Sequence, residues 1–364
     1  MIKVQSLQKI PFPQPDVVTK VVPAPVEGWD AISPLASMEP KRAPILTNWV
    51  PRPGWVELRG GFTQWGYIGT AVAVETIMIY RTGATEKMFA AAGGIIYDAT
   101  PGGTLSAVVP ALSSARWQYV SFTPSGAATV IQLCNGIDQM RQYNGTAWST
   151  PAITGLPGGL TTAAIRNIAS SKRRLWYVLG NGSGQGSTIA AFMATDAITG
   201  AIAGYTDLGA LYTKGGYLQA IGNWTIDGGS GPEDYVVFLS SRGQASIYVG
   251  TDPATANSWS LVGTFDLAPP ISLRCMTRVG SDLGLITQQG VLPISQALPF
   301  DPSADRSVAI TARIQNAMAE ASNFYKNNFG WQLISYPDQQ LGILNVPVQE
   351  NVEQVQFVMN VLTG

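Results

Sequence analysis

Histidine is missing from all 364 residues of this sequence. Its absence excludes the Ser-His-Asp triad, the Cys-His pair and most zinc sites, because each of these depends on an imidazole. The two cysteines, Cys134 and Cys275, stand far apart in apolar runs, so we expect two buried thiols rather than a disulfide. Catalysis by carboxylates or by Lys and Tyr does not need histidine, but no motif in this sequence singles out such residues. We therefore expect a protein that is not an enzyme and that has no cofactor and no metal site.

Charge is also scarce. Charged residues make up 12% of the chain, about half the share of an ordinary globular domain. The net charge is −1, and the densest basic run is Lys172-Arg173-Arg174. Sequence-specific binding of DNA normally needs many clustered Lys and Arg residues, so we do not expect it here. A lightly charged surface favours association, and we expect much of this surface to face other subunits.

Long apolar runs are missing as well. The N-terminus has no signal-peptide apolar region, and no stretch approaches the ~20 apolar residues of a membrane span. The sequence thus predicts a protein that is made in the cytoplasm and does not cross a membrane.

Proline dominates residues 1–48, where it occurs at positions 11, 13, 15, 23, 25, 34, 40 and 44. Proline fixes φ and removes an N–H donor, so a regular helix or a central strand is disfavoured. We expect an extended arm whose apolar residues are covered by its own domain or by a neighbouring subunit. The remaining chain, residues 49–364, is predicted to form one β domain.

From residue 49 onward, short apolar and aromatic runs alternate with Gly, Asn, Asp, Ser and Pro clusters, which is typical of strands and turns. A strand–turn–strand unit recurs at 88–100, 130–145, 173–195, 234–251, 283–295 and 331–348. Asn135-Gly136 is the strongest single turn signal among these units. Units spaced by roughly 40 to 60 residues resemble four-stranded propeller blades. The predicted fold is all-β, a β-propeller of six or seven blades, with a β-sandwich or a solenoid as alternatives.

One segment breaks the β pattern. Between Asp301 and Tyr325, apolar residues recur on one helical face. We expect a single inserted α-helix over 303–325, capped by Asp301-Pro302 or Ser303, that packs on the propeller or contacts a subunit.

Two glycine-rich loops invite a ligand interpretation. The run Gly180–Gly186 lacks the spacing of a dinucleotide loop and precedes a strand, so it predicts a hairpin loop. The acidic loop 227–234 matches no calcium loop and predicts a solvated connection between strands.

Two longer stretches carry a family resemblance. The first contains GWDAISPLASM at 28–38 and LTNWVPRPGWVELRGGF at 46–62; the second contains NFGWQLISYP at 328–337, LNVP at 344–347 and QFVMNVLTG at 356–364. Together they resemble a family of bacteriophage virion proteins of the tail or head–tail connector, similar to the tail nozzle (tubular tail) proteins of short-tailed phages. The resemblance implies a virion structural protein in a homo-oligomeric ring, expected to be a hexamer, below the portal and adaptor. Genomic DNA would pass through its lumen during ejection.

The residues predicted to contact other subunits lie in the proline-rich arm and just after it: Phe12, Val21, Val22, Trp29, Leu35, Trp49, Arg52 and Trp55. Two other functions stay open. A glycan-binding or glycan-cleaving propeller for host-surface recognition would have a pocket with paired carboxylates and exposed aromatics. A scaffold propeller of the cell interior would be a monomer with ordinary surface charge.

Overall fold

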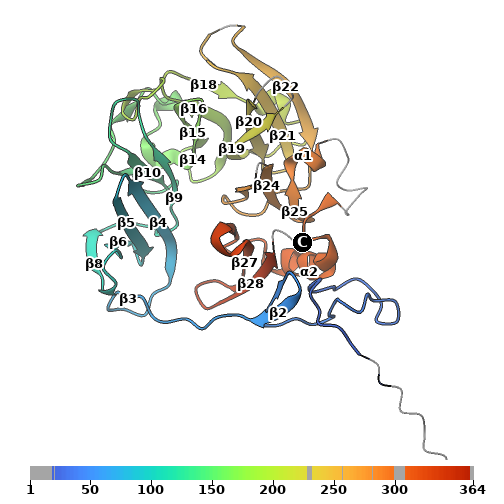
Figure 1. Ribbon diagram of the computed structural model, residues 1–364. Helices are drawn as coiled ribbons and strands as arrows, with labels where there is room; N and C mark the ends of the chain where they lie inside the picture. The colour runs from blue at the N-terminus through green and yellow to red at the C-terminus, as the bar shows by residue number, and fades with distance from the viewer. Residues whose placement is uncertain are drawn as a thin grey trace, which may run out of the picture.

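The computed structural model describes residues 19, 21–227, 232–255, 257–280, 282–298 and 308–360. Six antiparallel sheets of three or four strands follow one another along this chain and stand around a common centre (Figure 1). This arrangement is a β-propeller, and each sheet is one blade. The prediction of a propeller is confirmed, and the number of blades is six.

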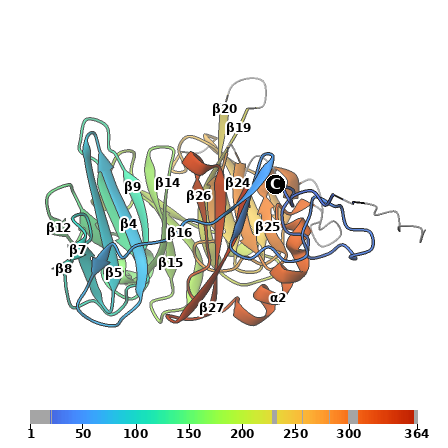
Figure 2. The ribbon, with the colours of Figure 1, turned by 60° about the horizontal axis from the view of Figure 1, so that its bottom comes forward.

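Successive blades use successive strands. Blade one consists of β4 (Val74–Thr82), β5 (Thr85–Ala92), β6 (Ile95–Asp98) and β8 (Ser106–Val109). Blade two consists of β9 (Gln118–Phe122), β10 (Val130–Cys134), β11 (Arg141–Tyr143) and β12 (Trp148–Ser149). Blade three consists of β14 (Ile165–Ser171), β15 (Arg174–Gly180), β16 (Gly186–Phe192) and β18 (Gly204–Asp207). Blade four consists of β19 (Leu218–Asp227), β20 (Pro232–Ser240), β21 (Gln244–Gly250) and β22 (Trp259–Asp266). Blade five consists of β23 (Met276–Val279), β24 (Asp282–Thr287) and β25 (Gly290–Pro293). Blade six consists of β26 (Gln332–Tyr336), β27 (Leu341–Gln349) and β28 (Glu353–Asn360). The β19–β20 hairpin projects beyond the neighbouring blades (Figure 2).

Shorter elements connect or flank the blades. They are the hairpin β1 (Trp49–Arg52) and β2 (Trp55–Leu58); the parallel pairs β3 (Gly66–Tyr67) with β7 (Gly103–Thr104) and β13 (Ile153–Thr154) with β17 (Gly200–Ala201); the helices α1 (Ile294–Ala297) and α2 (Gln315–Tyr325); and the 3-10 turns Pro157–Gly159, Thr162–Ala164, Gly209–Leu211, Ala312–Ile314 and Pro337–Gln339.

The six repeated sequence units are hairpins, one in each blade. They form β5–β6, β10–β11, β15–β16, β20–β21, β24–β25 and β26–β27. The Asn135-Gly136 turn is longer than a two-residue hairpin, because β10 and β11 first pair at Leu133 and Arg141. The Asn135 side chain accepts hydrogen bonds from the N–H groups of Ile137 and Asp138, which makes it an Asx turn.

The core lies between the faces of neighbouring blades. Along each strand, alternate residues point to opposite faces, so one face of a blade packs on the preceding blade and the other on the following one. Between blades one and two, Met78 and Phe89 pack with Trp117 and Ile131. Between blades three and four, the Trp176 and Phe238 rings meet edge to face, with their centroids 5.4 Å apart.

The inserted helix is shorter than predicted. Helix α2 begins at Gln315, and Ile314 at its N-terminus makes no side-chain cap. The predicted caps Asp301 to Ser303 lie outside the described residues, and the described residues before α2 form turns and a 3-10 turn. Met318 and Ala321 are buried as the pattern predicted, whereas Phe324 is exposed. The helix therefore packs on blade six with a narrower face than the sequence indicated.

The N-terminal part differs from the predicted extended arm. Residues 27–43 double back, with the Glu27 N–H donating to the Lys41 carbonyl and the Ala43 N–H donating to the Gly28 carbonyl. The first blade begins at β4 rather than at residue 49, because β1 and β2 lie beside β28 of blade six (Figures 1 and 2). This hairpin thus links the last blade to the first through the chain that follows it.

Candidate functional site

The centre of the propeller is occupied by a short loop of blade five, Ser272–Arg274, which we call the axial loop. The Ser272 carbonyl accepts a hydrogen bond from the Gln219 amide of blade four at 2.8 Å. The Leu273 carbonyl accepts one from the Asn167 amide of blade three at 2.9 Å. Ser272 has a φ of 70°, in the region that favours glycine, so these contacts hold a strained turn in place.

Arg274 extends the contacts of the axial loop to the other three blades. Its Nη2 donates to Oγ1 of Thr76 in blade one at 2.7 Å and to the Trp117 carbonyl at the start of blade two at 2.9 Å. Its Nη1 donates to Oε1 of Gln332 in blade six at 3.3 Å. Three consecutive residues therefore connect blade five with all five other blades.

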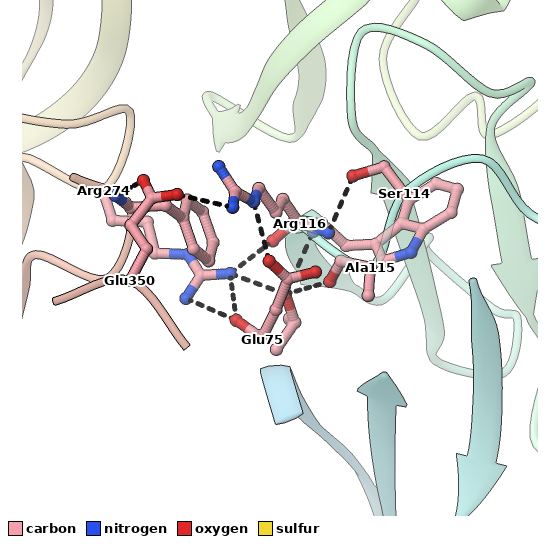
Figure 3. A network of polar contacts seen from close by, with 9 residues as sticks. Glu75, Ser114, Ala115, Arg116, Arg274 and Glu350 are labelled. Carbon is pink, nitrogen blue, oxygen red and sulfur yellow. Dashed lines mark hydrogen bonds and ion pairs between the residues drawn. The ribbon is translucent and has the colours of Figure 1, made fainter. Parts of the chain in front are cut away.

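A second polar cluster joins blade six to blades one and two, and we call it the clasp (Figure 3). Arg116, which precedes blade two, donates to Glu75 of β4 at 2.8 Å and to Glu350 of the β27–β28 turn at 3.0 Å. Two guanidinium groups contact the Phe329 ring, with Arg116 at 4.7 Å and Arg274 at 4.9 Å from its centroid. The clasp thus closes the ring of blades near the axis.

Electrostatics agree with this geometry. Burial alone would raise the pKa of the Glu350 carboxyl, but the Phe329 N–H and Arg116 hold that pKa below its ordinary value. Burial lowers the pKa of the Arg274 guanidinium to about 10. Both groups remain charged at neutral pH, and the guanidinium is stabilised by neutral carbonyl, hydroxyl and amide oxygens.

A small cavity of about 200 Å³ lies next to the axial loop. Its lining includes Trp117 and Tyr119, and Arg274 is its one charged residue. No Asp or Glu lines this cavity, whose walls all belong to the described part of the chain. Glycoside hydrolysis uses a pair of carboxylates, so this cavity does not supply the arrangement that the glycan-cleaving alternative requires.

A much larger groove, of about 900 Å³, lies on blade one, and we call it the seam groove. Its floor is the β4–β5 face with Ile77, Ile79 and Met88, and its walls include Trp65, Tyr67 and Val72. The opposite face of blade one packs on blade two, so the seam groove lies on the face of blade one that is turned away from blade two. Blade six stands on that side of blade one (Figure 1). It is strongly apolar, and Glu86 is its one charged lining residue.

The eight predicted contact residues fall into three groups. Phe12 lies outside the described residues. Trp29 and Arg52 are engaged within the chain: the Trp29 ring meets Phe357 edge to face at 5.7 Å, and Arg52 pairs with Glu57 and donates to the Gln339 carbonyl. The exposed members are Val21, Val22, Leu35, Trp49 and Trp55.

Exposed apolar residues concentrate in the first quarter of the chain. Of the 27 large hydrophobic side chains that are exposed among the described residues, 14 lie between residues 21 and 77. They include Phe62, Trp65 and Ile77, which the sequence did not single out. The density of Trp residues between positions 49 and 65 was the available signal for this clustering.

Metal and membrane features are absent from the regions that the structure covers. The described residues contain no group of three or more Cys, Asp or Glu side chains placed to hold a metal ion. Within the same residues, no helix is long and apolar enough to cross a membrane.

No protein-family model matches the sequence, and no curated protein is significantly similar to it. Among solved structures, the chain is similar to BBS1N in its complex with ARL6DN, with a TM-score of 0.39, 10% identity and coverage of 60% of this chain and 63% of that one. It is also similar to the extracellular domain of BT4673 from B. thetaiotaomicron, with a TM-score of 0.39, 13% identity and coverage of 79% and 34%. The chain spans less than two thirds of the length of either protein.

Proposed function

We propose that this chain is a structural subunit of a bacteriophage tail, of the nozzle or tail-tube kind, that acts by assembly into a ring and not by catalysis. One observation carries the proposal: the exposed apolar side chains gather between residues 21 and 77. A surface of this kind is costly in a monomer and is stabilised when another subunit covers it. The sequence resemblance at both ends of the chain supplies the kind of assembly.

The proposed ring encloses DNA between subunits and not within one propeller. The axial loop Ser272–Arg274 occupies the centre of the blades and makes hydrogen bonds to blades on every side. A duplex therefore cannot pass along the axis of a single subunit. In the assembled tail, the lumen would lie at the centre of a ring of copies below the portal and adaptor, where DNA passes without sequence-specific contacts.

Charge supports a passive channel. The chain has a net charge of −1, and many of its Arg and Lys side chains are neutralised within the fold, as in the pairs Arg42–Glu27, Arg52–Glu57 and Arg116–Glu75. Binding that depends on counterion release from DNA needs free basic groups. A nearly neutral lumen would let DNA slide through during ejection.

The test is the mass of the purified full-length protein in solution, together with electron micrographs of the same sample. We expect ring-shaped oligomers, six-fold in projection. In a variant that lacks residues 1–22, we expect a folded protein that assembles more weakly, because the deletion removes Val21 and Val22 of the exposed apolar surface. This deletion ends before Glu27 and Asp30, whose contacts belong to the folded part of the chain. A wild-type protein that stays monomeric at high concentration would contradict the proposal.

A further inference from the structure

The seam groove, of about 900 Å³, is an apolar surface that no part of the described chain fills. Its floor comes from a face of β4 and β5 that would contact blade six if the two blades met along their whole length. Ile77 in this floor is 57% exposed, and Val74 and Val72 beside it are also exposed. Blade six likewise leaves Ile334, on the face turned away from blade five, exposed. The facing sides of blades one and six therefore both present exposed apolar residues.

We propose that the seam groove of one subunit receives the proline-rich N-terminal segment, residues 1–18, of a neighbouring copy. This inference rests on the proposed ring assembly and names the contact that holds it together. The segment contains the sequence Ile10-Pro11-Phe12-Pro13-Gln14-Pro15. Such a sequence favours the extended polyproline II conformation, which loses little conformational entropy on binding.

The chemistry of the groove fits this occupant. Grooves that bind proline-rich segments are lined by aromatic residues, and Trp65 and Tyr67 line one wall here, both of them exposed. The floor offers aliphatic and thioether side chains to Ile10 and Phe12. The one charged lining residue, Glu86, already pairs with Arg81. Contact with apolar and aromatic side chains therefore carries the recognition of the segment.

The positions of the two surfaces favour exchange between copies. The N-terminal part of the described chain contacts the region of α2 at Ala31, whose N–H donates to the Arg313 carbonyl and whose carbonyl accepts from the Asn316 amide. The seam groove lies on blade one, and blade one stands on the other side of blade six from α2 (Figure 1). The N-terminal segment and the seam groove therefore belong to two different surfaces of one subunit, so the segment of one copy can bind the groove of the next. Repeated head to tail, such an interface forms a ring when the rotation between successive copies closes.

Disulfide trapping tests the inference on the full-length protein. Two copies with tags of different length are co-expressed, one with Phe12→Cys and the other with Ile77→Cys, and are then oxidised. We expect a covalent heterodimer on a non-reducing gel. The native thiols do not interfere, because Cys134 and Cys275 are fully buried and burial raises the pKa of the Cys275 thiol to about 12. The matched control is Ile137→Cys in place of Ile77→Cys, since Ile137 of blade two is 60% exposed and lies outside the groove.

The outcomes separate this inference from the proposed function. Crosslinking of Phe12→Cys to Ile77→Cys only within one chain, seen in the double variant, would overturn the exchange between copies. Intact rings without any crosslink to Ile77→Cys, or with equal crosslinking to Ile137→Cys, would overturn the groove as the binding site and leave ring assembly standing. A monomeric wild-type protein would overturn both.

A second measurement does not depend on crosslinking. Ile77→Asp and Phe12→Asp should each weaken assembly, as measured by the concentration at which rings dissociate, whereas Ile137→Asp should leave it unchanged. In the matching pair Ile77→Ala and Phe12→Ala, which adds no charge, the double variant is no weaker than the weaker single variant if the two residues meet. Circular dichroism establishes that each variant is folded. Additive losses would place the two residues in separate contacts and would count against the inference.

Discussion

The Arg274 guanidinium of blade five and the Thr76 hydroxyl of blade one are joined by a hydrogen bond of 2.7 Å across the centre of the propeller. Thr76 is itself buried and donates to the Ala115 carbonyl at 2.7 Å. The pair therefore continues a chain of polar contacts from blade five through blade one to the chain entering blade two. These contacts join blades five, one and two beside the small cavity at the axis.

Arg274→Met should lower the free energy of unfolding by about 2–3 kcal/mol, because it leaves the enclosed acceptors on Thr76 and Trp117 without their charged donor. Denaturant unfolding measures the change. Arg278→Met, at an exposed position on the next strand, serves as the control and should stay within about 0.5 kcal/mol of the wild type. Equal effects of the two substitutions would show that the axial contacts add no stability.

Asp30 should make the N-terminal segment sensitive to acid. Burial alone would raise the pKa of Asp30, but hydrogen bonds from Ser33, Ile32 and Arg42 lower it to about 2. The ordinary value is 3.8, so the folded state favours the ionised form. Its stabilising contribution is complete above about pH 4 and is lost as the pH falls towards 2.

Hydrogen exchange of residues 27–43 between pH 2 and pH 5 measures this effect. Protection in the wild type should fall across that window, and Asp30→Asn should remove the pH dependence while lowering protection at neutral pH. Glu39→Gln, at an exposed carboxylate of the same segment, should keep the wild-type profile. A wild-type profile without pH dependence would contradict the prediction.

Glu350→Gln should loosen blade six by about 1 kcal/mol or less, because the Arg116–Glu350 pair is partly exposed and solvent screens it. The loss should be local, in hydrogen exchange of β26 and β27, and smaller at high salt. Arg81→Met breaks the more exposed Arg81–Glu86 pair and should change neither quantity. A similar loss of protection in all six blades would argue against a local clasp.

Two buried tryptophans give a matched comparison of a hydrogen bond in the core. Both Trp331 and Trp176 are fully buried. The Trp331 indole donates to the Tyr325 carbonyl at 2.9 Å, whereas the Trp176 indole N–H has no acceptor among the described residues. Trp331→Phe should therefore cost about 1 kcal/mol more than Trp176→Phe in denaturant unfolding. The reverse order would mean that the Trp331 hydrogen bond does not contribute to stability.

Local patterns were sufficient to predict the hairpins. Each of the six units combines an apolar strand of period two with turn residues, and each forms a hairpin of one blade. Helix limits were less accurate, because the apolar spacing from Ile310 onward continues through turns that precede α2. The apolar spacing indicates which side chains face the core. The same spacing can occur in a series of turns as well as in a helix.

The sequence by itself determined a histidine-free, lightly charged, six-hairpin β protein with a proline-rich start, because composition and strand period are local properties. Only the tertiary structure decided that Arg274 closes the axis, that Glu350 reaches Arg116, and that one face of blade one stays open. Arg274 and Thr76 are 198 residues apart, and Arg116 and Glu350 are 234 apart. No local pattern encodes such pairs, since they form only when the first and last blades are brought around a common centre.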